Sequence, residues 1–286
     1  MYTPSIDVTR LKAIDVHVHL EPPGDQSAAS EAAKQYFKDT GVPREGAALA
    51  DYYRSRDMAC VVFTVDETLS GVRRLTNDQV VEFALANTDI AIPFASLNPT
   101  RGAEAVREAR RLVDAGVVRG LKLHPPIQLF SPDDRIAYPL YEVFAEKKLP
   151  VLFHTGHSGI GSGMRCGGGL RLEYSNPMHL DDVAIAFPDM QIVIAHPSWP
   201  WQDEALSVAM HKPNVWIDLS GWSPKYFPPQ LVQYANTLLR DRVLSGSDWP
   251  LISPDRWMKD FEQAGFRDEA KPLILKDNAV RLLGLA

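Results

Sequence analysis

The stretch AIDVHVH, residues 13–19, guides the interpretation of the whole sequence. Its β-branched residues predict a strand, and successive side chains of a strand point to opposite faces. On this alternation Asp15, His17 and His19 share one face, while the apolar residues Ile14, Val16 and Val18 share the other. The apolar face suits a layer of helices. We therefore expect the polar face, with both imidazoles, to point into the mouth of a barrel.

Short β-branched runs like this one recur along the chain, and most are followed by an amphipathic stretch with helical periodicity. Alternating strands and helices favour parallel pairing through right-handed crossovers. Eight such runs occur, which is the number that a (β/α)8 barrel needs. They cover residues 13–17, 60–65, 90–95, 118–123, 150–154, 192–196, 215–219 and 242–246.

A doubly wound open sheet would give the same alternation of elements. Helices are predicted at residues 77–87 and 103–115, where apolar residues recur at helical spacing with charges opposite. Eight strands in 286 residues, with no linker and no shift in composition, favour the closed barrel. The expectation is therefore an α/β fold, a TIM barrel that forms a single domain over residues 1–286.

The composition excludes several classes of function. The chain has 30 Lys and Arg against 36 Asp and Glu, so its net charge of -6 gives no electrostatic basis for binding nucleic acid. No apolar run approaches the roughly 20 residues that span a bilayer, so we expect no membrane segment and a cytoplasmic protein. Only Cys60 and Cys166 are present, and we expect both to be free.

Two connections are too long to be simple turns: residues 20–46 after the first strand and residues 155–178 after the fifth. Both follow the carboxyl end of a strand, where barrel enzymes build their active sites. The second holds seven of the 18 glycines between Gly156 and Gly169. It is either a solvent loop or a segment whose backbone N–H groups, with Arg165 and Arg171, wrap an anionic substrate.

Six of the eight histidines lie at or just after the carboxyl end of a predicted strand. His17 and His19 are expected about 7 Å apart on one strand face, and a divalent metal would satisfy both. His154, His196 and Asp248 end the fifth, sixth and eighth strands, so a closed barrel would bring all five side chains together. Taken singly, His196 could instead cap a strand end and Asp248 could be a helix N-cap.

With these residues in place, the sequence resembles the amidohydrolase superfamily over nearly its whole length. Within it, the chain is similar to the branch that includes aminocarboxymuconate-semialdehyde decarboxylase, resorcylate-type decarboxylases, oxalomesaconate hydratase and lactone hydrolases. The motifs that carry the resemblance lie at residues 15–19, 120–125, 152–154, 195–197 and 246–250.

The resemblance implies one divalent metal, with zinc expected and manganese or iron as alternatives. Its ligands would be His17, His19, His154 and Asp248, and a bound water would complete the shell. As the catalytic residues, Asp248 or His196 would take the proton of the bound water, and His196 matches a histidine that family members use as acid, base or oxyanion partner beside the metal. Lys122 lies where members with two metals carry a carboxylated lysine, but this branch is usually mononuclear.

Several residues are candidates for binding a substrate. Lys122 and His124 would bind a carboxylate or carbonyl, although Lys122 could instead form an internal salt bridge. Tryptophans after the sixth and seventh strands could line a pocket for a flat aromatic substrate, or simply pack in the core. His179 and His211 fall in predicted helices and are expected to be solvent-facing or satisfied. The substrate-binding candidates are Lys122, His124, His157, Arg165, Trp199 and Trp249.

Three functions fit this constellation. The preferred one is a hydrolase in which metal-activated water attacks an ester, lactone, thioester or β-keto carbonyl of a small aromatic-derived acid or acyl-CoA. The stretches 174–183 and 195–202 look like the subgroup labelled 4-hydroxyphenyl-β-ketoacyl-CoA hydrolase, which would act in aromatic compound catabolism. The second function is a non-oxidative decarboxylase of a phenolic or muconate-type acid, and the third is a non-catalytic metal-binding barrel. The family habit also implies a homo-oligomer.

Overall fold

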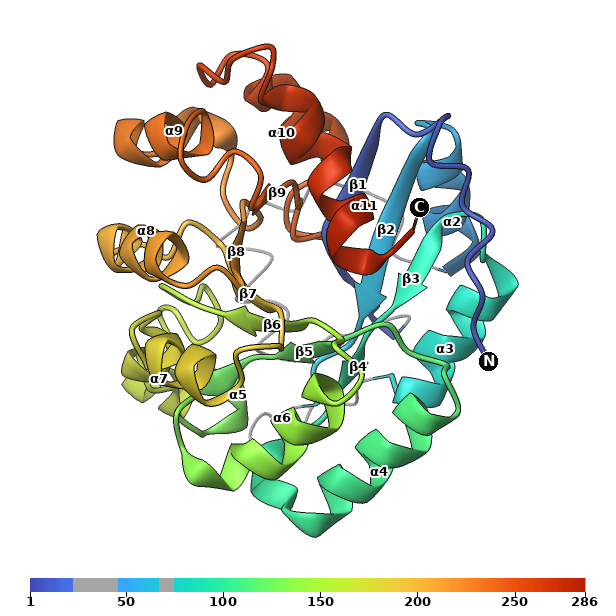
Figure 1. The fold of residues 1–286 in the computed structure, drawn as a ribbon, viewed down its shortest axis with the longest axis vertical. Helices are drawn as coiled ribbons and strands as arrows, with labels where there is room; N and C mark the ends of the chain where they lie inside the picture. The colour runs from blue at the N-terminus through green and yellow to red at the C-terminus, as the bar shows by residue number, and fades with distance from the viewer. Residues whose placement is uncertain (23–45, 67–74, 286) are drawn as a thin grey trace.

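The computed structural model describes residues 1–22, 46–66 and 75–285. Parallel strands form a ring with helices around it (Figure 1), so the predicted TIM barrel is confirmed. The strands cover Ala13–His19 (β1), Met58–Phe63 (β2), Ala91–Pro93 (β3), Ala95–Ser96 (β4), Leu121–Leu123 (β5), Val151–His154 (β6), Ile192–Ala195 (β7), Val215–Asp218 (β8) and Val243–Leu244 (β9).

Helices follow most of the strands, as the alternation predicts. The expected helices at residues 77–87 and 103–115 are confirmed within one residue as α3 and α4, and α3 begins with a capping box between Thr76 and Gln79. The helices cover Gly46–Arg54 (α2), Asn77–Ala86 (α3), Ala103–Asp114 (α4), Pro125–Gln128 (α5), Tyr138–Ala145 (α6), His179–Ala186 (α7), Gln202–His211 (α8), Pro229–Ala235 (α9), Pro254–Phe261 (α10) and Asn278–Leu283 (α11).

The third predicted strand, residues 90–95, is observed as the two short strands β3 and β4. The chain changes hydrogen-bonding partners at Phe94, whose N–H donates to Val62 O on β2. The next N–H, of Ala95, donates instead to Gly120 O at the start of β5. Because the residues before and after Phe94 pair with opposite neighbours, this strand joins the sheet β1–β3 to the sheet β4–β9.

The barrel closes where β1 meets the chain that follows β9. Val18 forms a parallel bridge with Trp249. The His19 N–H donates to Trp249 O at 2.9 Å, and the Asp248 N–H donates to His17 O at 3.0 Å. Backbone hydrogen bonds therefore join the two segments that carry His17, His19 and Asp248.

A register shift in β1 changes which way its side chains face. Between Asp15 and Val18, β1 has one residue more than its partner β2. Ile14 and Val16 consequently lie among the side chains that fill the barrel, and Asp15 contacts Tyr53 of α2. The predictions that Asp15 shares the face of the histidines, and that Ile14 and Val16 pack on helices, are therefore wrong. Val18 does pack in the helix layer, as expected.

The core has an inner and an outer layer. The inner layer gathers side chains from strands all around the ring, including Phe63, Phe94, Leu152 and Trp216, so the barrel is filled rather than open. The outer layer packs the backs of the strands against the helices, and its larger cluster includes Phe153. Because apolar side chains fill the barrel, the polar side chains that share one site lie at the carboxyl ends of the strands.

The long connection after the fifth predicted strand contains short helical turns. Two 3₁₀ helices, Arg165–Gly169 and Leu172–Ser175, lie within residues 155–178. The Gly156 N–H donates to Ser175 O, and the Ser175 hydroxyl donates back to Gly156 O, so this connection is pinned at its base. Most of the first long connection, residues 23–45, lies outside the described residues.

Two smaller expectations can be checked in the same structure. Cys60 is buried and Cys166 is exposed, and both are free as predicted. Among the residues described, no helix combines the length and the apolar character needed to cross a bilayer.

The junction at Phe94 gives a test of the barrel's packing. A Cβ at Gly120 would lie 2.5 Å from the Phe94 ring, which is itself buried inside the barrel. We expect Gly120→Ala to lower the free energy of unfolding by about 1–3 kcal/mol through overpacking. Urea denaturation measures this. Gly46→Ala is the control, because its Cβ would meet Phe83 at an ordinary 3.4 Å, and an equal loss in both variants would contradict the packing argument.

Candidate metal centre

Three metal-ligating side chains meet at the mouth of the barrel. Asp248 Oδ1 lies 3.3 Å from His17 Nε2 and 3.2 Å from His19 Nε2. One ligand atom from each residue falls within 4.8 Å of the others. Burial alone would raise the pKa of Asp248, but the hydrogen bond to His19 and the neighbouring His196 lower it below its usual value. Asp248 is therefore a carboxylate at neutral pH.

The other side of the His17 ring is fixed by an acid that the sequence analysis did not select. His17 Nδ1 lies 2.7 Å from Asp218 Oδ2 at the end of β8, and both side chains are fully buried. An Nδ1–H that donates to this carboxylate leaves the lone pair on Nε2. Burial lowers the pKa of His17, so its ring is neutral and available as a ligand.

Lys122 lies beside the same imidazole, as its inward position on β5 predicts. Its Nζ is 3.1 Å from His17 Nε2 and 5.1 Å from the centre of the Phe63 ring. Burial lowers the pKa of Lys122, while Asp248 and Asp218 oppose that effect. Burial likewise raises the pKa of Asp218, against the hydrogen bond from Ser220 and the charge of Lys122.

Three further histidines pack together across the mouth. His154 Nδ1 lies 2.9 Å from His196 Nε2, and the rings of His154 and His124 stack with centroids 3.8 Å apart. The His17 and His196 ring centres are 4.9 Å apart, so this group adjoins the three ligands. Burial lowers the pKa of His196 to about 4. The strand-end histidines thus lie together at the mouth, and their convergence on a single metal stays a prediction.

The residues present fit a divalent metal. Asp248 Oδ1 and the unprotonated Nε2 of His17 are both acceptors, so their 3.3 Å approach favours a cation between them. His154 Nε2 is buried and has no hydrogen-bond partner among the described residues. Buried polar atoms are normally paired, so this nitrogen has the surroundings expected of a further metal ligand. His154 lies outside the three-residue group, and its role as fourth ligand stays a prediction.

Sequence reasoning missed Asp218 and Ser220. Asp218 is the last residue of β8 and the last but one of the seventh predicted strand, so the strand-end criterion that selected the histidines and Asp248 could have found it. Ser220 offered no comparable signal, because a serine after a strand is common in any loop. A Cβ at Gly246 would meet Asp218 Oδ1 and would lie 2.9 Å from Ser220 Cβ, so only glycine leaves room for the pair.

The remaining substrate-binding candidates lie in different surroundings. His157 packs edge-on against Trp199 at 5.4 Å, and Trp199, 46% exposed, lies 6.3 Å from Trp222. These residues follow β6, β7 and β8, so an aromatic rim fits their positions. Arg165 is exposed on its 3₁₀ helix, and within the described part of the chain it forms no hydrogen bond or ion pair with the metal-ligating residues. Substrate contacts by these residues remain predictions.

Trp249 requires a correction. Its side chain is 1% exposed and packs against Tyr52 at 4.8 Å and Tyr53 at 6.2 Å, both on α2. It therefore lies in the outer layer, because adjacent strand-end residues point to opposite sides and Asp248 occupies the inward position. This placement does not support Trp249 as a substrate contact.

The two helical histidines have the satisfied or solvent-facing positions expected for them. His179 lies 3.1 Å from both Asp133 and Glu173, and His211 is exposed beside Lys212.

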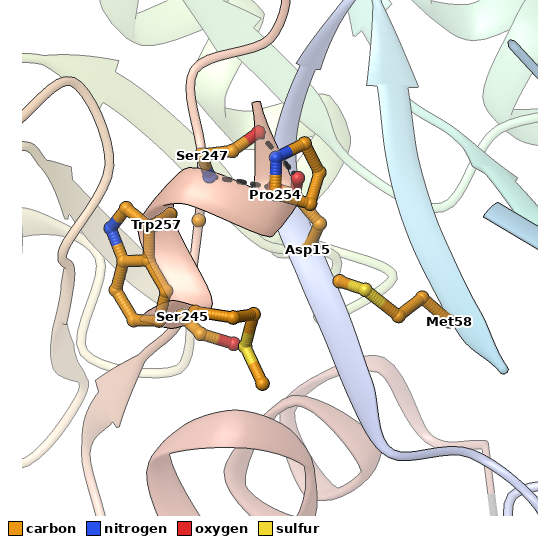
Figure 2. Close-up of a pocket in the computed structure, with 8 residues that line it drawn as sticks. Asp15, Met58, Ser245, Ser247, Pro254 and Trp257 are labelled. Atoms are coloured by element: carbon orange, nitrogen blue, oxygen red, sulfur yellow. Dashed lines mark hydrogen bonds between the residues drawn. The ribbon is translucent and has the colours of Figure 1, made fainter. Parts of the chain in front are cut away.

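Asp15 organises the centre from behind, as Figure 2 shows for its hydrogen bonds to Ser247. Its buried carboxylate accepts from the Ser247 N–H at 2.9 Å, the Ser247 hydroxyl at 2.5 Å, the Tyr53 hydroxyl at 2.7 Å and the His17 N–H at 3.1 Å. A small cavity beside Asp15 is bordered by Met58, by residues 245–247 after β9 and by residues of α10. Asp15 thereby ties the backbone of one ligand, His17, to the residue before another, Asp248.

Comparison with known proteins agrees with this geometry. The amidohydrolase family profile matches residues 14–285. The chain belongs to the amidohydrolase family. The three-ligand centre and the family together identify it as a metal-dependent enzyme, while the branch suggested by the sequence stays a prediction. The finer subgroup suggested by residues 174–183 and 195–202 is not tested by these matches.

Three individual proteins are similar to this amidohydrolase in sequence or in fold. Protein fluG of Emericella nidulans is 35% identical over 127 residues, which is 42% of this chain but only 13% of that protein. An uncharacterized TIM-barrel protein from Bordetella bronchiseptica is 24% identical with a TM-score of 0.77, covering 95% of this chain and 98% of that one. A dihydroxybenzoic acid decarboxylase from a Polaromonas species, solved with manganese and the inhibitor 2-nitroresorcinol, is 16% identical with a TM-score of 0.66, covering 96% and 97%.

Removing the Tyr53 hydroxyl tests the role of Asp15. We expect Tyr53→Phe to lower the free energy of unfolding by about 1–3 kcal/mol, because a buried carboxylate loses one of its donors. Its metal affinity should also fall, since the backbone holding His17 and Asp248 loosens. Denaturation and chelator competition measure the two effects. Tyr52→Phe is the matched control, because that hydroxyl donates to the exposed carboxylate of Asp255; a similar loss in the control would refute the assignment.

A metal titration tests the fourth ligand. We expect one divalent ion per chain in the wild type, and His154→Ala should weaken its binding by at least about 10-fold, the effect typical of disturbing even an indirect partner of a metal. His211→Ala, on the exposed face of α8, should bind metal like the wild type. Elemental analysis after dialysis measures occupancy, and full occupancy in His154→Ala would exclude His154 from the ligand set.

Proposed function

We propose that this amidohydrolase is a metal-dependent, non-oxidative decarboxylase of a small phenolic acid. The observation that carries the proposal is the burial of its polar cluster: Lys122 is 0%, His154 5% and Asp248 7% exposed. A site from which water is excluded disfavours the charge of a bound carboxylate and so favours its loss as neutral carbon dioxide. The fold it shares with the manganese-containing dihydroxybenzoic acid decarboxylase supports the same reaction.

Each group at the mouth has a part in this scheme. The metal, manganese or zinc, would supply the positive charge that binds the carboxylate and an adjacent phenolic oxygen. Lys122, in its protonated form, would add a second positive charge facing the substrate anion. His157 and Trp199 would flank a flat ring at the rim.

Proton transfer falls to Asp248 rather than His196. Both nitrogens of His196 already have protein partners, Ser220 Oγ at 3.0 Å and His154 Nδ1 at 2.9 Å. Asp248 would take the phenolic proton of the substrate on Oδ2 and return it to the ring carbon that bears the carboxylate. The new C–H bond uses the ring electrons, the C–C bond then breaks, and its electron pair restores the aromatic ring as carbon dioxide leaves.

Hydrolysis, which we preferred from the sequence alone, thus becomes the alternative to decarboxylation. The same centre could activate water against a carbonyl, so the thioester hydrolase suggested by residues 174–183 and 195–202 is the competing function. It differs in its product, because hydrolysis releases an acid and a thiol or alcohol without carbon dioxide. Zinc as the metal, a homo-oligomer and a cytoplasmic location remain proposals.

A substrate panel decides between the reactions. Manganese- or zinc-loaded enzyme is incubated with hydroxybenzoates that carry a hydroxyl next to the carboxylate, with 4-hydroxybenzoate as the control that lacks this adjacent hydroxyl, and with β-keto thioesters and lactones. We expect carbon dioxide from the first group only, because only these acids combine a carboxylate with an adjacent phenolic oxygen, the pair that the metal would bind.

In deuterium oxide the product should carry deuterium at the carbon that lost the carboxylate. Asp248→Asn should abolish turnover, and His211→Ala should retain it. Release of acid from a thioester or lactone, with no carbon dioxide from any phenolic acid, would establish the hydrolase instead. Metal binding without turnover of any compound would favour the non-catalytic barrel.

A further inference from the structure

Ser220 occupies a position in the metal centre that the proposed function does not use. It follows β8, and its fully buried Oγ lies 2.7 Å from Asp218 Oδ2, 2.9 Å from His17 Nδ1 and 3.0 Å from His196 Nδ1. One hydroxyl thus contacts a carboxylate and two imidazoles. Because a hydroxyl has a single proton, the direction of each of these hydrogen bonds can be worked out.

The carboxylate sets the first direction. Both oxygens of Asp218 act as acceptors here: Oδ1 receives the Ser220 N–H at 2.9 Å, and Oδ2 receives the Ser220 hydroxyl at 2.7 Å. The Ser220 proton is therefore already used, and the contact with His196 requires the imidazole to donate its Nδ1–H.

The remaining directions follow from the first. A neutral His196 with its proton on Nδ1 has a lone pair on Nε2. The 2.9 Å contact between His196 Nε2 and His154 Nδ1 then requires His154 to donate. His154 Nε2 is left without a proton, and this is the buried nitrogen that lacks a partner among the described residues.

The backbone around Ser220 leaves little freedom for another arrangement. A Cβ at Gly221 would lie 2.9 Å from His196 Cε1, and Gly221 has φ +75°. A Cβ at Gly246 would lie 3.1 Å from His17 Cβ. The backbone can approach His196 and His17 this closely only because Gly221 and Gly246 have no side chains. This close packing holds the two imidazoles against Ser220.

We propose that Ser220 is a positioning residue of the metal centre: its hydrogen bonds fix the proton of His196 and of His154 on Nδ1 and so present His154 Nε2 as a metal-binding nitrogen. The inference rests on the metal site of the proposed function but not on the reaction catalysed there.

Wild-type protein alone gives the first test. Nitrogen-15 NMR of histidine-labelled protein, free and loaded with diamagnetic zinc, reports which ring nitrogen carries the proton. We expect His196 and His154 to carry it on Nδ1, with the His154 Nε2 resonance shifting when zinc is added. A proton on Nε2 of either ring in the zinc-loaded protein would overturn the proposal, and this measurement does not depend on any variant's folding.

The second test removes the hydroxyl. We expect Ser220→Ala to raise the zinc dissociation constant on the order of 10-fold, as loss of a partner behind a metal ligand commonly does, and to populate a second tautomer of His196. The control is Ser198→Ala, because the buried Ser198 hydroxyl, two residues after His196, bonds the Thr155 hydroxyl and the backbone carbonyl of His196 rather than an imidazole nitrogen. It should keep the wild-type tautomers and zinc affinity.

The outcomes separate this inference from the proposed function. Unchanged tautomers and zinc affinity in Ser220→Ala would refute the role of Ser220 even if carbon dioxide is released. Conversely, the expected NMR pattern and weaker zinc binding would support Ser220 even if the substrate panel reveals a hydrolase.

Discussion

The parallel pairing of β1 with the chain after β9 is the constraint on which the metal centre depends. It joins Val18 to Trp249, so residues from the two ends of the chain become neighbours. His17 and His19 lie on one side of this seam and Asp248 on the other. The separation of the three ligands is therefore set by backbone hydrogen bonds, which tolerate little change in length. Asp15 reinforces the seam from the outer side, because it accepts donors from both segments.

Burying this many ionisable groups would be prohibitive without internal compensation. Each buried ionisable group is compensated by different neighbours or by loss of its charge. Asp15 is surrounded by donors, and Lys122 faces the carboxylates Asp218 and Asp248. Burial lowers the pKa of His17, His154 and His196 and keeps their rings neutral. Among the described residues His154 Nε2 has no partner, and Asp248 Oδ1 faces the lone pair of His17 Nε2 at 3.3 Å; a divalent cation would compensate both.

Much of this arrangement is predictable from sequence, because the carboxyl ends of parallel strands in a barrel share one mouth. That rule alone brings His17, His154, His196 and Asp248 together. It fails where one residue alters the period: the extra residue in β1 turns Asp15 outward while leaving His17 and His19 inward. Such an insertion leaves no mark in the pattern of apolar residues, since Ile14 and Val16 suit the inner layer as well as the outer one.

Other features depend on contacts between distant segments. Ser220 matters only because β8 brings it beside His17 and His196, which lie on β1 and beyond β7, and no local pattern encodes that meeting. Trp249 shows the opposite case, in which a residue adjacent to a ligand belongs to the hydrophobic core. Neighbouring positions in a strand-end motif alternate in direction, so the residue next to a ligand is more often structural than chemical.

The strand ends determine which chemical groups the site offers, but they do not determine the substrate. The polar groups at the mouth are buried and held by one another, so they can present a cation, a carboxylate and an ammonium group to many small anions. The residues at the rim, such as His157 and Trp199, come from the connections after β6 and β7 and lie partly in solvent. One of these connections is pinned at its base by Ser175 and Gly156, which leaves the stretch between free to vary in sequence without disturbing the ligands. We therefore expect these connections to determine the choice between a phenolic acid and a thioester, whereas the metal centre itself depends on how the barrel closes.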